Sequence, residues 1–402
     1  MLKGKTVVLG VTGSIAAYKT ANLASALKKL GADVHVIMTK NATNFINPIT
    51  FETLTGNKCL IETFDRDFEF NVEHVSLADK ADVFMVAPCS ANVIGKIAGG
   101  IADDMLTTTI MACKAKKIIS PAMNTNMFEN PIVQENIEKL KKYDYEIIEP
   151  ATGYLACGDT GKGKMPEPEV LLEYILKVIA CDKDLEGKKV LITAGPTKEA
   201  IDPVRFISNH STGTMGYALA KNAVRRGAEV TLVTGPTSID KPMFVGVVEV
   251  ESANEMFDAV DKVFDEQDIV IMSAAVADYK PKNKSKEKIK KSEKSVIIEL
   301  EENKDILFEM SKRKKNQFLV GFAMETENMI ENSRHKLEQK NLDLICANNL
   351  KTEGAGFGTG TNVITLITKD SEEELPKASK DTVASQILDK VCRSCKYQIS
   401  EG

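Results

Sequence analysis

Three residues in the N-terminal half have side chains suited to proton transfer or polar binding. His74, one of only four histidines, lies in the segment EHVSL, Asn124 lies in the run PAMNTNMF, and Cys157 lies in the glycine-rich stretch LACGDTGKGK. Imidazole, amide and thiol groups can all serve a reaction centre. Each residue also has a structural interpretation, because a lone histidine, a Met-Asn-Met stretch and a cysteine beside glycine usually serve packing.

A second group of residues has the composition of a phosphate cradle. Gly13 and Ser14 follow an apolar, strand-like run and precede a helix-like segment, which would expose backbone N–H groups and a hydroxyl. Ser90 and Asn92 follow a predicted strand at 83–87. Ligands of parallel sheets favour the carboxyl ends of the strands, so these residues indicate a binding edge.

The C-terminal half repeats this arrangement with more hydroxyl groups. The run SNHSTGTMG, from Ser208 to Gly216, places hydroxyls and glycines directly before a helix-like segment, where amides can approach a phosphate. The same composition also suits an ordinary helix N-cap. A predicted strand at 269–273 then runs into AAVADY, which brings small residues and Asp278 to another strand end.

The most biased stretch of the chain carries eight lysines between Lys280 and Lys294. Such a run is usually a solvated or disordered face. It also suits a mobile cationic flap that closes over a triphosphate. Nucleic-acid binding is less favoured, because the aromatic residues needed for base stacking are missing here.

The elements that would position these residues alternate between strand and helix. Strands are predicted at 5–12, 83–87, 117–120 and 145–148, and again at 188–194, 269–273, 318–323 and 343–347. Both halves open alike, and Gly31 and Gly227 mark the predicted end of the first helix in each. The pattern predicts an α/β fold of two Rossmann-like domains with mainly parallel sheets. The polar segment ACDKDLEGKK separates domains predicted at 1–181 and 187–402.

A pair of dinucleotide-binding domains is the nearest alternative for such a fold. Neither first turn reads G-x-G-x-x-G, and Pro196 removes a backbone donor from the second turn. The second strands end in Thr39 and Thr234, where an NAD fold usually places an acidic residue for the ribose. An NAD-dependent oxidoreductase therefore stays the runner-up hypothesis.

Composition excludes several other classes. Of the 402 residues, 43% are apolar and 27% are charged, a balance typical of globular proteins rather than disordered or fibrous ones. The net charge of −5 argues against broad nucleic-acid binding, and no apolar run reaches about 18 residues, so neither a membrane span nor a cleaved leader is expected. Eight scattered cysteines predict reduced thiols in a cytoplasmic protein. Cys392 and Cys395 form a single CxxC motif without a second pair of cysteines, which is only weak evidence for a zinc site.

The first half resembles the flavin-dependent cysteine decarboxylase family in five features, which follow in this order along the chain: GSIAAYK, His74, APCSAN, PAMNTNMF and LACGDTGKGKMPE. The resemblance implies FMN as cofactor, bound by Gly13, Ser14, Thr39, Ser90 and Asn92. It also implies that His74 acts as a base toward the substrate thiol, that Asn124 holds the substrate carboxylate, and that Cys157 supplies a proton when an enethiol is reduced. Phe128 departs from the tryptophan that commonly ends the family motif, a change in packing that removes no titratable group.

The second half resembles phosphopantothenate-cysteine ligases in the ordered motifs DPVRFISNHSTGTMG, SAAVADY, KIKK, NKDIL, GFAMET and DLICAN. The resemblance implies that Asn209 and Arg205 handle an acyl-nucleotide intermediate and that Lys288 stabilises charge during nucleotidyl transfer. The residues implied to bind the nucleotide are Ala274, Ala275, Asp278, Lys288, Asp305, Ile306, Leu307, Phe308, Phe322, Lys336 and Lys340. Lys336 and Lys340 are four apart, so on a helix they would share a face. Lys304 stands where many relatives have proline.

Together the two resemblances imply a bifunctional enzyme of coenzyme A biosynthesis. The ligase would activate the carboxylate of 4'-phosphopantothenate with CTP, and the amine of cysteine would then displace CMP. CTP is implied by bacterial relatives, and Mg2+ is expected with the triphosphate, its ligands being unassigned. The decarboxylase would convert phosphopantothenoylcysteine to 4'-phosphopantetheine through a thioaldehyde, whose C=S group accepts the electron pair left by CO2.

The family also implies a homo-oligomer, with trimeric decarboxylase units, dimeric ligase units and, in some members, a dodecamer. A non-catalytic flavoprotein regulatory subunit is a second alternative to the bifunctional enzyme. The joint presence of His74, Asn124 and Cys157 disfavours it.

Overall fold

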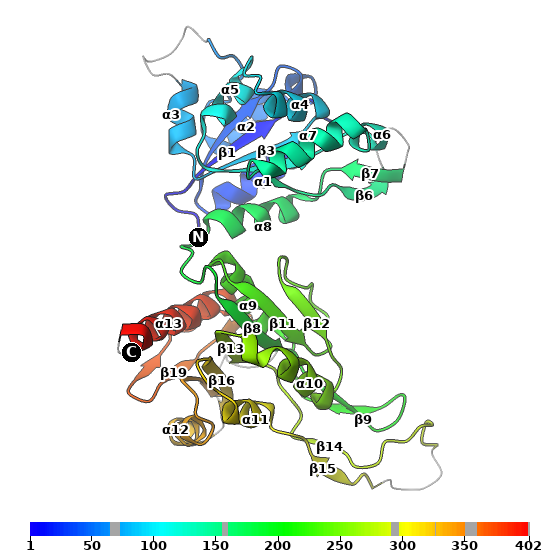
Figure 1. The fold of residues 1–402 in the computed structure, drawn as a ribbon, viewed down its shortest axis with the longest axis vertical. Coiled ribbons are helices and arrows are strands. Elements are labelled where there is room, and N and C mark those ends of the chain that lie inside the picture. Colours follow the sequence, from blue (N-terminus) through cyan, green and yellow to red (C-terminus); the bar gives the residue numbers. More distant parts are fainter. Residues whose placement is uncertain (65–72, 155–159, 291–296, 326, 350–359, 401–402) are drawn as a thin grey trace. The chain divides into compact units, whose positions relative to one another are not determined.

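The computed structural model describes residues 1–64, 73–154, 160–290, 297–325, 327–349 and 360–400. The chain divides into two compact units, Met1–Asp182 and Lys183–Gly402, each considered by itself (Figure 1). Each unit has a mainly parallel sheet with helices on both faces, so the predicted α/β, Rossmann-like fold is confirmed. No helix in the described ranges is long and apolar enough to cross a membrane.

The first unit is built on a five-stranded parallel sheet in the order β2-β1-β3-β4-β5. Its strands are β1 (Thr6–Val11), β2 (Asp33–Met38), β3 (Val83–Cys89), β4 (Lys116–Pro121) and β5 (Glu146–Ile147). The central strand β3 is buried at every residue, because helices cover both faces of the sheet. The strand order reverses between β1 and β3, and this switch point is where doubly wound sheets bind their ligands.

Two helical layers enclose the first sheet. On one face lie α1 (Ala17–Lys29), α2 (Pro48–Thr55) and α8 (Pro168–Ile179), and on the other lie α3 (Glu73–Lys80), α4 (Ala91–Gly99), α5 (Met105–Ala112) and α7 (Pro131–Lys142). Helix α1 is followed by Gly31 at φ +90°, a left-handed conformation that glycine adopts without strain, as predicted. A 3-10 turn at Ala42–Asn44, α6 (Thr125–Phe128) and a hairpin of β6 (Ala151–Tyr154) and β7 (Thr160–Lys164) complete the described part of the unit.

The second unit has an eight-stranded sheet in the order β12-β11-β8-β13-β16-β17-β19-β20. Its strands are β8 (Lys189–Ala194), β11 (Glu229–Thr234), β12 (Gly246–Glu249), β13 (Ile269–Met272), β16 (Phe318–Glu325), β17 (Leu344–Asn349), β19 (Thr365–Ile367) and β20 (Glu372–Glu374). The first six pair in parallel, and β19 and β20 extend the edge in antiparallel fashion. The order reverses between β8 and β13, which creates a second switch point.

Helices again cover both faces of this sheet. Helices α9 (Thr214–Arg225) and α13 (Lys380–Ser400) pack on one face, and α10 (Ala253–Val263), α11 (Ile306–Lys312) and α12 (Met329–Gln339) pack on the other, with a 3-10 turn at Phe264–Glu266. Arg226, only 5% exposed, ties α9 to α13 by donating to the backbone oxygen of Ser385 at 3.1 Å and pairing with Asp389. Three two-stranded sheets stand apart: β9 (Lys198–Ala200) with β10 (Phe206–Ser208), β14 (Tyr279–Pro281) with β15 (Leu300–Glu302), and β18 (Thr361–Asn362) with β21 (Ala378–Ser379).

Candidate active sites

A cavity of about 510 Å³ lies at the switch point of the first sheet. Its walls include every residue predicted to bind FMN, namely Gly13, Ser14, Thr39, Ser90 and Asn92. The ends of β1 and β3 are tied together through Thr12, whose hydroxyl donates to the Pro88 carbonyl at 2.8 Å and accepts from the Ser90 N–H at 2.9 Å. A Cβ on Gly13 would lie 2.9 Å from the Cβ of Asn41, so a larger residue would push the β2 loop away.

The polar groups of this cavity suit a phosphate-bearing ligand such as FMN. The Thr39 hydroxyl is buried without a hydrogen-bond partner in the described part of the chain, a condition that costs about 1–3 kcal/mol unless a ligand relieves it. Ser90 is the N-cap residue of α4, yet its side chain does not cap the helix, which leaves its hydroxyl and the helix amides for a ligand. Lys96 also lines the cavity, and its hydrogen bond to Asp103 at 2.7 Å raises the pKa of its ammonium group.

Of the three residues assigned to decarboxylation, His74 and Asn124 are described by the structure, and neither lines this cavity. Half-buried His74 belongs to α3, which packs against α5, and it does not line the cavity of its own chain. Asn124 directly follows Met123, which does line the cavity, and its Oδ1 accepts from the N–H of Asn126 at 2.9 Å. Cys157 lies outside the described residues.

The hairpin that flanks Cys157 in the sequence is anchored beside Asn124. The N–H of Met123 donates to the Gly163 carbonyl at 3.1 Å. A Cβ on Gly161 would lie 2.4 Å from the Thr125 hydroxyl, so the backbone of β7 touches the residue after Asn124. Phe128, at the end of α6, is 7% exposed and packs into the core.

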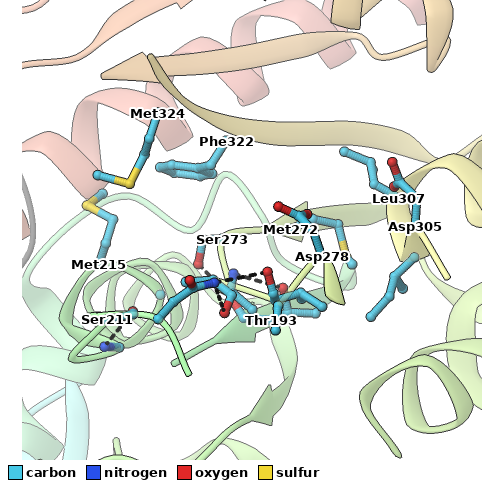
Figure 2. A pocket seen from close by; sticks show the side chains of 18 of the residues that line it. Thr193, Ser211, Met215, Met272, Ser273, Asp278, Asp305, Leu307, Phe322 and Met324 are labelled. Carbon is cyan, nitrogen blue, oxygen red and sulfur yellow. Dashed lines mark hydrogen bonds between the residues drawn. The ribbon is translucent and has the colours of Figure 1, made fainter. Parts of the chain in front are cut away.

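A larger cavity of about 640 Å³ lies at the switch point of the second sheet (Figure 2). The predicted ligase residues that line it are Asn209, Ala274, Ala275, Asp278, Asp305, Ile306, Leu307, Phe322, Lys336 and Lys340. Phe322, Met324 and Met215 gather at one end, and Asp278, Asp305 and Leu307 gather at the other. The cavity therefore has an apolar end and an acidic end.

One side of the second cavity is formed by residues at the ends of β8 and β13 and by the segment that precedes α9. The Thr193 carbonyl accepts from the Ser273 hydroxyl at 2.6 Å, and the Thr193 hydroxyl accepts from the Ala274 N–H at 3.2 Å. The Asn209 amide donates to the carbonyl oxygens of Ala275 at 3.2 Å and Val276 at 3.1 Å, which fixes the segment before α9. These bonds hold the small-residue segment and the helix start at one edge.

At this site carboxylates pair with Lys336 of α12 and with Lys340, the residue that directly follows α12. The Lys340 ammonium lies 2.6 Å from Asp305, and the Lys336 ammonium lies 2.6 Å from Glu325. The other oxygen of Asp305 caps α11 by accepting from the N–H of Phe308 at 3.0 Å. Exposed Asp278 adds a further negative charge, so this side of the cavity does not attract anions by itself.

Three predicted ligase residues do not line the cavity, namely Arg205, Lys288 and Phe308. Arg205 is engaged by the buried carboxylate of Asp202 and donates to the carbonyl of Ile289 at 2.9 Å. Lys288 is exposed on the segment that this bond anchors. The ring of Phe308 faces the ammonium of Lys312, 4.2 Å from the ring centroid.

Asp202 is the centre of this anchor, and the sequence motifs did not single it out. Its side chain has no exposed surface and accepts from the N–H groups of Val204 and Arg205 at 2.8 Å and of Ile289 at 3.1 Å. The Arg205 guanidinium beside it holds the pKa of the Asp202 carboxyl well below its usual range. The contact joins residues 87 positions apart, so only the spacing DPVR hinted at it.

The cysteines and acidic residues of the described segments offer no site for a bound metal. No group of three or more His, Cys, Asp and Glu residues there is arranged to hold an ion. Burial raises the pKa of both the Cys392 and the Cys395 thiol to about 11, so neither is a thiolate near neutral pH. Both are free thiols on α13.

Comparison with known proteins finds two family models, one for each half of the chain. Residues 1–180 match the family model described as Flavoprotein, and residues 185–394 match that described as DNA/pantothenate metabolism flavoprotein C-terminal domain. The coenzyme A biosynthesis bifunctional protein CoaBC of Bacillus subtilis (strain 168) is 48% identical over 400 residues, covering 98% of each chain. Its counterpart in Vibrio vulnificus (strain CMCP6) is 44% identical over 393 residues, 97% of this chain and 98% of the other. The crystal structure of the C-terminal domain of a CoaBC protein is 43% identical, with a TM-score of 0.47, and covers 54% of this chain and 99% of that one.

Proposed function

Because the chain belongs to the family of bifunctional coenzyme A biosynthesis proteins, we propose that it catalyses two consecutive reactions of that pathway. The domain at 187–402 joins 4'-phosphopantothenate to cysteine at the expense of CTP. The domain at 1–181 then removes CO2 from phosphopantothenoylcysteine to give 4'-phosphopantetheine. One observation carries this proposal: each unit has its own cavity at its own switch point, lined by residues suited to a different ligand.

The ligase reaction needs an activated carboxylate, because a free carboxylate is a poor acylating agent. The phosphopantothenate carboxylate attacks the α-phosphate of CTP, pyrophosphate leaves, and the cysteine amine displaces CMP from the acyl-cytidylate. The hydroxyls and amides that precede α9 bind phosphate oxygens, and Asn209 orients the intermediate. Lys288 stabilises the negative charge on the oxygens of the transferred phosphoryl group, with Asp202 and Arg205 positioning its segment. Mg2+ accompanies CTP as a counter-ion, and no residue is assigned to it.

The decarboxylation needs an electron sink β to the carboxylate, which two-electron oxidation of the thiol-bearing carbon would create as a C=S group. FMN would be held by the unpaired Thr39 hydroxyl, by Ser90 and by the amides at the start of α4. When bound, FMN would supply reversible two-electron oxidation of the thiol-bearing carbon. His74 takes the thiol proton, and Asn124 binds the carboxylate so that its C–C bond is aligned for cleavage. Cys157 returns a proton to carbon at the end of the cycle.

A homo-oligomer is part of the proposal, and exposed apolar side chains support it. In the first unit Ile15, Tyr18 and Ile49 are each more than half exposed. Because His74 does not line the cavity of its own chain, we expect a second copy to supply the base. Native mass spectrometry of the purified chain is expected to give a multiple of three, and a monomer would contradict this part of the proposal.

Spectroscopy and fragment assays test the division of labour. The purified protein is expected to show flavin absorption bands, and residues 1–182 alone should release CO2 from phosphopantothenoylcysteine without CTP. Residues 183–402 should form the amide without flavin. A colourless protein that fails to bind added FMN would contradict the first assignment, and fragments that fold but lack these activities would contradict the division.

A further inference from the structure

Three hydroxyl groups next to the start of α9 have no role in the account so far. The Tyr217 hydroxyl lies 2.9 Å from the Thr237 hydroxyl and 3.2 Å from the Thr234 hydroxyl. Tyr217 is 3% exposed and Thr234 is 2% exposed, and none of the three residues lines the cavity of the second unit. A row of hydroxyls imposes directions that apolar packing does not, because each group can donate only one hydrogen.

The direction of each hydrogen bond in this row follows from the group at its end. The Thr234 hydroxyl donates its single hydrogen to the Gly235 carbonyl at 2.9 Å. It can therefore only accept from Tyr217, and Tyr217, having donated to Thr234, can only accept from Thr237. The Thr237 hydroxyl is thus held as a donor, which fixes the rotamer of this β-branched side chain.

The fixed rotamer places the methyl group of Thr237 directly against two glycines. A Cβ on Gly213 would lie 2.7 Å from that methyl carbon, and a Cβ on Gly195 would lie 2.9 Å from it. Gly213, at φ +76°, directly precedes α9, and Gly195, at φ +75°, directly follows β8. The methyl group therefore occupies the place that a side chain would take at either glycine.

Tyr217 also holds Gly213 through the backbone. Its N–H donates to the Gly213 carbonyl at 3.1 Å, so Tyr217 contacts this glycine directly and, through Thr237, a second time. Gly213 belongs to the run Ser211–Gly216, here called the α9 loop, and every residue of that loop lines the cavity (Figure 2). The α9 loop is therefore held by side chains that do not line the cavity themselves.

The segment that carries Thr237 is fixed by contacts of its own. The N–H of Gly235 donates to the Ala194 carbonyl at 2.9 Å. A Cβ on Gly235 would lie 1.7 Å from the carbonyl oxygen of Pro196, so the two backbones are in direct contact. Thr237 is thereby tied to the end of β8 and to the turn that follows it, which makes it a firm support for Gly213.

We propose that Tyr217 and Thr237 are positioning residues for the nucleoside triphosphate, because they hold the α9 loop in the conformation that binds phosphate oxygens. This inference rests on the proposed ligase function, in which that loop binds the phosphates. Tyr217 acts by fixing the rotamer of Thr237, and Thr237 acts through its methyl group on Gly213. Without this restraint the loop must be ordered when the ligand binds, which lowers the affinity for the triphosphate.

Titrations of the full-length protein with CTP, pyrophosphate and cytidine at fixed Mg2+ test the proposal. Tyr217→Phe removes one hydroxyl and leaves Thr234 bonded to Gly235, so the group that it releases is Thr237. Loss of one neutral hydrogen bond predicts that CTP and pyrophosphate bind about 3- to 10-fold more weakly. Cytidine, which has no phosphate, should bind unchanged. In the ligase assay KM for CTP should rise by the same factor, whereas KM for cysteine should not change.

A double variant separates positioning from a general loss of stability. Thr237→Ala should weaken CTP binding by a similar factor, and Tyr217→Phe should add nothing further in the Thr237→Ala protein, because the group that Tyr217 restrains is then absent. Thr237→Ser, which keeps the hydroxyl and loses the methyl group, should behave like Thr237→Ala. Ser238→Ala removes an exposed hydroxyl one residue later and is the matched control, with CTP binding unchanged.

The outcomes separate the positioning role from the ligase function itself. Unchanged CTP and pyrophosphate binding in Tyr217→Phe, or an equal loss for cytidine, would overturn the positioning role. Additive losses in the double variant, or normal CTP binding by Thr237→Ser, would overturn it as well. A wild-type protein that binds neither CTP nor pyrophosphate would instead refute the ligase function, and this inference with it.

Discussion

Gly216 controls how closely α9 approaches the sheet edge, and its replacement by alanine is the sharpest structural perturbation of the ligase site. A Cβ at this position would lie 2.5 Å from the Cβ of Ala194, 2.7 Å from the Ser273 hydroxyl and 3.1 Å from the Thr193 carbonyl. Two of these atoms belong to the end of β8, and the third belongs to Ser273, which directly follows β13 and donates to the Thr193 carbonyl at 2.6 Å. Carbon atoms pack at about 3.5–4.0 Å, so Gly216→Ala should displace the start of α9 by about 1 Å.

The expected magnitudes follow from that displacement. Overpacking of this kind costs about 1–3 kcal/mol. In a unit of this size each kcal/mol lowers Tm by about 2–4 °C, so the ligase unit should lose roughly 2–12 °C. Misplacement of bound groups by about 1 Å can slow a reaction about 100-fold, which is about 2.7 kcal/mol and therefore comparable with the effect on folding.

Pyrophosphate release from CTP and 4'-phosphopantothenate, measured without cysteine, isolates the affected step. Gly216→Ala should slow this half-reaction about 100-fold in folded protein, while CO2 release from phosphopantothenoylcysteine stays unchanged. Gly246→Ala is the matched control, because a Cβ there would meet only the Val230 carbonyl at an ordinary 3.5 Å. A near-normal rate for Gly216→Ala, or the same loss for Gly246→Ala, would refute the reasoning.

Three further predictions concern single contacts. Thr39→Val should weaken FMN binding about tenfold in a fluorescence titration without destabilising the apoprotein, because the lost hydroxyl has no partner in the described part of the chain; unchanged FMN affinity would contradict this. Lys288→Gln should slow pyrophosphate release about 100-fold or more, and Lys284→Gln should slow it much less. Equal, small losses of rate in both variants would indicate that the segment is an ordinary solvated loop. Asp202→Asn should slow the same step by releasing the Lys288 segment. The folded pKa of Asp202 lies below its unfolded value of about 3.9, so the carboxylate is charged and its stabilisation is fully present above that pH. The loss of rate in Asp202→Asn should therefore be constant between about pH 6 and 9. A loss of rate that varies with pH across this range would contradict the anchoring role of Asp202.

Much of the first-unit cavity was predictable because its wall is made of strand ends. Gly13 and Ser90 each follow an apolar run, and parallel strands bring their carboxyl ends to one edge, so sequence order placed them together, whereas Thr39 was assigned by the family resemblance. The same reasoning found Ala274 and Asp278 in the second unit. These are local signals combined with one topological rule.

The remainder depends on contacts between distant segments that leave little local trace. The hairpin of β6 and β7 is rich in Gly, Thr and Lys and lacks apolar alternation, and β19 and β20 have only three residues each. Arg205 lies outside the cavity because Asp202 and the Ile289 carbonyl hold its guanidinium. The contact with Ile289 joins residues far apart in the sequence, so local sequence patterns could not predict it. Lys380, which also lines the second cavity, looks in sequence like an ordinary helix start, and only the packing of α13 against α9 brings it there.

Tracing the carboxyl carbon of cysteine tests the bifunctional account most directly. The full-length protein, loaded with FMN, is incubated with 4'-phosphopantothenate, CTP, Mg2+ and cysteine labelled with carbon-13 in its carboxylate. The account predicts that the label appears first in phosphopantothenoylcysteine and then as labelled CO2, with 4'-phosphopantetheine unlabelled and no release of label when CTP is omitted. Labelled CO2 formed without CTP, or a labelled amide that never loses its carboxylate, would contradict it.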